Sequence, residues 1–110
     1  LPISSGTLDV CDVIARLQSK GLEAGQTGER IADPSGVVPG EVVRVEGLTV
    51  QVYMFPDASA AEKEYEAATS GESWLPEWIA TPHFAHMGNL FITMVTDDEV
   101  LAARIIEALR

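Results

Sequence analysis

Three features of the sequence predict an α+β fold. Residues typical of strands flank Gly47 and again Gly88, which predicts two β-hairpins. A helical segment follows each hairpin, and Gly47 and Asp57 are as far apart as Gly88 and Asp98. An amphipathic helix precedes both. Together these features predict the order α-β-β-β-α-β-β-α, with two-layer helix-on-sheet packing on an antiparallel sheet of about five strands.

The two hairpin-helix segments, residues 42–68 and 78–110, predict an internal ββα duplication within a single domain, 1–110. At the same spacing Ala61 falls on Ala102, and Glu66 falls on Glu107. If the two units are equivalent, their backbones superpose and both helices pack on the same face of the sheet.

Composition excludes several classes of protein. The chain has 110 residues and is 46% hydrophobic, enough to bury a core. Its net charge of −10 argues against nucleic acid and against anionic membrane surfaces. No apolar run approaches the roughly 20 residues of a membrane helix. We therefore expect no membrane insertion by this chain, while a signal peptide or lipid anchor upstream stays open. The single cysteine excludes an internal disulfide.

The first helix has recognisable signals at both ends. Thr7 is expected to be the N-cap, and Gly21 fits the left-handed residue that closes a helix, with Leu22 packing back on the last turn. Cys11 is expected to be half-buried beside the apolar stripe. That stripe, at helical spacing, consists of Val10, Val13, Ile14 and Leu17.

Residues 22–30 are polar and contain glycine, which predicts a strand at the edge of the sheet. Residues 32–41 are predicted to be a loop with a turn at Pro39-Gly40. A two-residue turn at Glu46-Gly47 then pairs Val45 with Leu48 and Val43 with Val50, so that these valines share the inner face with Val52 and Met54.

Two further helices are predicted. The helix from Ala58 presents mostly small residues to the sheet: Ala58, Ala61, Tyr65 and Ala68. The last helix begins with a predicted capping box, Thr96 to Glu99, in which acidic side chains lie at the positive helix end. Its buried stripe is Leu101, Ile105, Ala108 and Leu109.

The second hairpin is apolar on both faces. Around Met87-Gly88, Phe84 is expected opposite Phe91 on the inner face, with Ala80 opposite Val95 and Trp78 beside them. The outer face then contains Ala85 and a candidate binding face of Ile79, Thr81, His83, Leu90, Ile92 and Met94. Strands buried on both sides have this pattern, so something covers the outer face. Another copy of the chain, a partner protein, an apolar ligand and the 32–41 loop all remain candidates.

The segment Trp78-Ile79-Ala80-Thr81-Pro82-His83-Phe84, followed by Gly88-Asn89-Leu90 and Asp97-Asp98, resembles a motif in uncharacterised bacterial lipoproteins and cell-envelope domains. The resemblance extends upstream through Val38-Pro39-Gly40 and Val50–Tyr53 and covers most of the chain from about residue 38. It implies an extracytoplasmic location and no assigned activity. Such domains follow a lipidated cysteine, whereas Cys11 lies inside a predicted helix and does not match that anchor.

No constellation of residues predicts catalysis, a cofactor or a metal. His83 and His86 are the two histidines, and residues three apart in a strand point to opposite faces. His83 is expected to bond to a neighbour on the sheet. The chain is therefore not expected to be an enzyme. We expect a non-catalytic extracytoplasmic domain that binds a protein partner, or itself as a homodimer, through the sheet face. The alternative is a small-molecule or peptide-binding sensor with a pocket between sheet and loop, lined by Trp74, Trp78 and His83.

Overall fold

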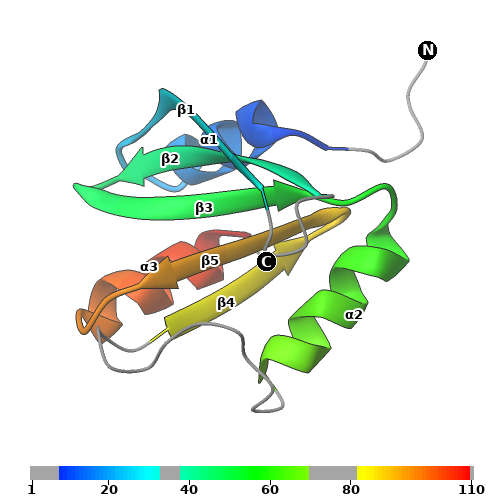
Figure 1. Ribbon diagram of the computed structural model, residues 1–110. Coiled ribbons are helices and arrows are strands. Elements are labelled where there is room, and N and C mark those ends of the chain that lie inside the picture. The colour runs from blue at the N-terminus through cyan, green and yellow to red at the C-terminus, as the bar shows by residue number, and fades with distance from the viewer. Residues whose placement is uncertain (1–7, 33–37, 70–81, 110) are drawn as a thin grey trace.

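The structure is a computed structural model that describes residues 8–32, 38–69 and 82–109. The predicted order of elements is confirmed, and Figure 1 shows their arrangement. In chain order they are α1 (Val10–Ser19), β1 (Ala24–Ala32), β2 (Pro39–Val45), β3 (Leu48–Met54), α2 (Ala58–Thr69), β4 (Pro82–Met87), β5 (Leu90–Val95) and α3 (Glu99–Leu109).

The strands form one five-stranded antiparallel sheet in the order β1-β2-β3-β5-β4. β1 lies at one edge, as its polar sequence predicts. β3 is central and joins the two hairpins, because it pairs with β2 on one side and with β5 on the other. Across the β3–β5 junction Val52 is opposite Ile92 and Val50 is opposite Met94.

The predicted register of the first hairpin is confirmed. Val45 pairs with Leu48, and Val43 pairs with Val50. Glu46 and Gly47 both have positive φ, 51° and 84°, as the two central residues of a type I′ turn require.

The predicted register of the second hairpin is wrong. The turn is at Gly88-Asn89 rather than Met87-Gly88, so Phe84 pairs with Thr93 and not with Phe91. Gly88 has a φ of 59°, the positive value that the first position of a type II′ turn demands. The turn lies one residue later than predicted, so each pairing shifts by two residues. Because side chains alternate with a period of two, those of the described residues still divide between the two faces as predicted.

The assignment of those faces as inner and outer is reversed. Leu90, Ile92 and Met94 are at most 1% exposed and belong to the main hydrophobic core. The same core includes the inner valines of β2 and β3 together with apolar residues of α1 and α3. These two helices therefore cover the face that was expected to need a partner. Sheet and helix pair form the two layers that enclose this core.

The second helix, α2, packs on the other face of the sheet. Its Tyr65 joins a smaller cluster around Tyr53 and Phe91, and the Phe91 ring stacks on that of Phe84 with centroids 5.8 Å apart. Figure 1 shows α1 and α3 behind the sheet and α2 in front of it. The ββα order occurs twice, as predicted, but the expected superposition of the two units with their helices on one face is contradicted.

A difference of one residue explains the opposite placement of α2 and α3. β3 has seven residues and β5 has six, while the connections Phe55–Asp57 and Thr96–Asp98 have the same length. Successive side chains in a strand point to opposite faces. Because β5 is one residue shorter than β3, the chain leaves β5 toward the opposite side of the sheet.

Both helices nevertheless begin with the same cap. The Asp57 carboxylate accepts a hydrogen bond from the Ala60 N–H at 2.8 Å, and Asp98 accepts from the Leu101 N–H at 3.1 Å. Each aspartate thus satisfies an N–H of the first turn, which has no partner inside the helix. The predicted Thr96–Glu99 capping box is wrong, because Thr96 Oγ1 instead accepts from the Asp98 N–H at 3.0 Å.

The ends of α1 are defined by Asp9 and Gly21. Asp9 is the N-cap, in a capping box with Asp12, so the prediction of Thr7 as N-cap is wrong. Thr7 itself lies outside the described residues. At the other end Gly21 has a φ of 84°, and the Leu22 N–H donates to the Leu17 carbonyl at 3.1 Å. This is a Schellman closure, and it buries Leu22 against the end of the helix, as expected.

Pro39-Gly40 begins β2 and does not form the predicted turn. Gly40 is buried and pairs with Tyr53 on β3 and Ile31 on β1. A Cβ at Gly40 would lie 2.8 Å from the Val52 carbonyl oxygen. Glycine is needed here because backbones approach closely, which sequence patterns do not distinguish from a turn.

Candidate functional site

The predicted binding face is not a surface in the structure. Its described apolar members, Leu90, Ile92 and Met94, lie in the core beneath α1 and α3. Ile79 and Thr81 lie outside the described residues. The sheet face therefore does not provide the docking surface that the sequence suggested, because the chain covers that face with its own helices.

The predicted pocket is described only at His83, because Trp74 and Trp78 lie outside the described residues. His83 is half-buried, and its Nε2 lies 3.1 Å from the Thr96 carbonyl oxygen. His86 is on the opposite face, where its ring packs on Tyr65 with centroids 4.7 Å apart. Within the described ranges no three His, Cys, Asp or Glu side chains come together in a group that could hold a metal ion.

Cys11 is exposed rather than half-buried. Its Sγ lies 3.9 Å from Gln26 Nε2 on β1. Cys11 is flanked by the exposed Asp9 and Asp12 of the α1 capping box.

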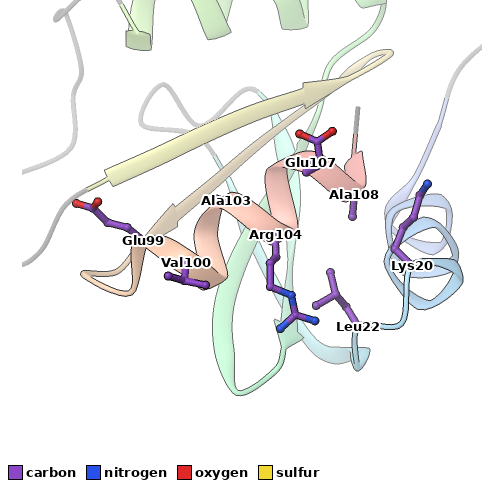
Figure 2. A pocket seen from close by; sticks show the side chains of 8 residues that line it. All are labelled: Lys20, Leu22, Glu99, Val100, Ala103, Arg104, Glu107 and Ala108. Carbon is purple, nitrogen blue, oxygen red and sulfur yellow. The ribbon is translucent and has the colours of Figure 1, made fainter.

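A groove between the end of α1 and the outer side of α3 is the candidate site. Its volume is about 700 Å³, within the range of ligand-binding clefts. Figure 2 shows the side chains that line it. They include Lys20, Leu22, Val100, Ala103, Arg104 and Ala108.

The fold creates this groove in two steps. The Schellman closure at Gly21 turns the chain back under α1, so that Leu22 is buried at the bottom of the groove while Lys20 stays exposed. The last helix then packs beside α1, with Ile105 and Leu109 facing the core. Ala108 is buried beside Leu22, and the small Ala103 leaves space above them.

Val100 is the exposed large apolar side chain among the residues that line the groove. It is 74% exposed, although it belongs to the first turn of a helix whose other large apolar residues are buried or half-buried. A single exposed valine needs no explanation by itself. Here it continues an apolar floor made by Leu22, Ala103 and Ala108, so the groove has a contiguous surface that can contact another apolar group.

Charged side chains surround this floor. Lys20 and Arg104 are cationic, and Glu99 and Glu107 are anionic, so the groove is formally neutral in a chain of net charge −10. In Figure 2 the Arg104 guanidinium extends toward Leu22, whereas Glu107 points to the other side of α3. In the part of the chain that the structure describes, none of these four side chains has an ion-pair or side-chain hydrogen-bond partner.

Sequence reasoning missed this groove. The signal on α3 was Val100, an apolar residue outside the predicted buried stripe of its helix. The contribution of Lys20 and Leu22 had no local signal, because these residues line one groove with Arg104 only after α1 has packed against α3. The arrangement can bind an apolar segment and an ionic group together, and it presents no nucleophile paired with a base.

Comparison with family models, with curated proteins and with solved structures found no match to this chain. Among the described helices, none has the length and hydropathy needed to cross a membrane.

Proposed function

We propose that this chain is a non-catalytic binding domain that recognises a protein partner through the groove between α1 and α3. The observation that carries the proposal is the apolar floor of that groove, which ends at the exposed Val100. Burial of an exposed side chain of this size contributes roughly 1.5–3 kcal/mol to association.

The open shape of the groove favours a protein segment over a small molecule. Small-molecule sites enclose most of their ligand's surface in a concave pocket. Here one wall is the side of α3 and the other is only Lys20 and Leu22, which follow the end of α1. A partner that lies along α3 can bury Val100 and Ala103 together, which is how amphipathic segments dock in helical grooves.

We further propose an extracytoplasmic location, in the cell envelope or as a secreted domain. The support is the resemblance of the segment from Trp78 to Asp98 to envelope domains. High net negative charge favours solubility and agrees with such a location without requiring it.

Photocrosslinking in cells that produce the chain tests the proposal. A photoreactive phenylalanine analogue is placed at position 100 or 103, in the groove, and at position 63, which is an exposed Lys on α2 across the sheet. We expect the same partner to be captured from 100 and 103 but not from 63. The captured protein is then purified, and its affinity for the wild-type domain and for Val100→Asp is measured.

Val100→Asp is a suitable variant because it changes the groove without threatening the fold. The residue is exposed and lies in the first turn of α3, where an acidic side chain is favourable. Loss of binding with an unchanged thermal unfolding curve supports the groove. Capture from position 63 alone, or equal affinity of Val100→Asp, would contradict the proposal.

A further inference from the structure

The charges around the groove constrain the chemistry of its occupant, an inference that rests on the function proposed above. Acidic residues outnumber basic ones by 17 to seven in this chain. Even so, Lys20 and Arg104 lie at one apolar floor without an acidic partner among the described residues. An arginine in this state has its guanidinium donors available for a carboxylate, which it binds in bidentate geometry.

We propose that the groove binds a short amphipathic segment of a partner protein in which an Asp or Glu side chain is flanked by apolar residues. The carboxylate binds Arg104, and the apolar residues cover Leu22, Ala103 and Val100. Charge complementarity at Arg104 and contact with the apolar floor are then satisfied by one ligand.

The other charges of the molecule limit how acidic this segment is. Glu99 and Glu107 border the same groove, and the whole chain has a net charge of −10. A run of several acidic residues would be repelled by these two glutamates and by the net negative charge of the chain. A segment with one carboxylate, and with neutral or basic residues toward Glu99 and Glu107, fits better than a polyacidic tail or a second copy of this acidic chain.

The length of the groove sets the length of the segment. Its α3 wall extends from Glu99 to Ala108, which at 1.5 Å per residue is about 14 Å of helix. An occupant of three helical turns, about 11 residues, covers this wall. A dodecapeptide is therefore long enough to reproduce the interaction.

A random dodecapeptide library displayed on phage provides the test. The library is panned in parallel on the wild-type domain, Val100→Asp, Arg104→Gln and Arg30→Gln, and the enriched pools are sequenced. Arg30 is the matched control, because it is an exposed arginine on β1 away from the groove. We expect the wild-type pool to be enriched in peptides that combine apolar residues with Asp or Glu. Their enrichment should fall by at least about tenfold on Val100→Asp and Arg104→Gln, and should persist on Arg30→Gln.

The outcomes separate this inference from the function on which it rests. One outcome overturns the proposed carboxylate contact but leaves the groove as a binding site. In that outcome the enriched peptides depend on Val100, show no preference for Asp or Glu, and bind Arg104→Gln as well as wild type. Enrichment of Lys- or Arg-rich peptides at the groove likewise overturns the proposed carboxylate contact. Peptides that bind Val100→Asp as well as wild type contradict both proposals. Absence of any enriched peptide overturns the claim that a short segment suffices, whereas the crosslinking experiment tests the function independently.

Discussion

The side chain of Asn89 hydrogen-bonds to both backbone groups of Leu8, 81 residues earlier in the chain. Its Nδ2 also donates to the Phe55 carbonyl at 3.1 Å, and the backbone carbonyl of Asn89 accepts from the Phe55 N–H at 2.9 Å. Asn89 is only 3% exposed. One buried residue of the β4–β5 turn therefore connects the segment that precedes α1 with the end of β3.

Replacement of Asn89 by Ala should destabilise the domain by about 2–4 kcal/mol, because up to three backbone groups of Leu8 and Phe55 lose their partner. Urea unfolding monitored by circular dichroism measures the change. Asn89→Asp should also destabilise, since a carboxylate cannot donate to the two carbonyls. Gln26→Ala, on the exposed edge strand, serves as the control and should change stability little. Equal stability of Asn89→Ala and wild type would show that these bonds do not hold the segments together.

Gly40→Ala should cost about 1–3 kcal/mol through steric strain. A Cβ at this position would lie 2.8 Å from the Val52 carbonyl oxygen and 3.0 Å from side-chain atoms of Ile31 and Tyr53. The backbone oxygen has little freedom to move, because β2 pairs with β3 at this point. Gly25→Ala on β1 is the matched control, since a Cβ there would meet nothing within 4 Å. If both variants unfold at the same urea concentration, the close approach of the backbones at Gly40 does not exclude a Cβ at this position.

Ile92→Lys should abolish cooperative folding. Ile92 is fully buried between the sheet and the α1/α3 layer, and burial of an unpaired ammonium costs several kcal/mol, a large part of the 5–15 kcal/mol by which domains are stable. Near-ultraviolet circular dichroism and the urea transition of the purified variant report the loss. Val100→Lys, on an exposed position of α3, should fold normally. A folded Ile92→Lys variant with altered association would restore the original expectation of an outer binding face.

We predict no specific zinc or copper site at the histidines. His83 is bound to the Thr96 carbonyl on one side of the sheet, and His86 packs on Tyr65 on the other. Calorimetric titration with Zn²⁺ and Cu²⁺ is the measurement. A one-to-one site of micromolar affinity that disappears in His83→Ala would contradict this prediction.

The elements that local signals define were predictable from the sequence. Gly47 between Val45 and Leu48 specifies the first hairpin and its register, and Asp57 and Asp98 mark the starts of two helices. In each case the residues that determine the structure are within a few positions of one another.

The errors arose where the outcome depends on distant parts of the chain. β3 and β5 differ by one residue, and this reverses the face on which the next helix packs. The turn at Gly88-Asn89 is an exception, because Gly-Asn is a favoured pair for a type II′ turn and Met-Gly is not, so a local signal was present in addition to the hydrogen bonds of Asn89 to Leu8 and Phe55. The groove, in contrast, depends on distant residues, since Leu22 and Arg104 are brought together only by the packing of α1 on α3.

The affinity of the crosslinked partner for single-site variants tests the central claim, that the α1/α3 groove is the binding site, most directly. Isothermal titration calorimetry compares the wild-type domain with Val100→Asp in the groove and with Arg44→Glu, an exposed change on β2 outside this groove. We predict that Val100→Asp weakens binding by at least about tenfold, or 1.4 kcal/mol, while Arg44→Glu leaves the dissociation constant unchanged. Unchanged affinity of Val100→Asp together with loss of binding by Arg44→Glu would contradict the account and place the interface elsewhere on the domain.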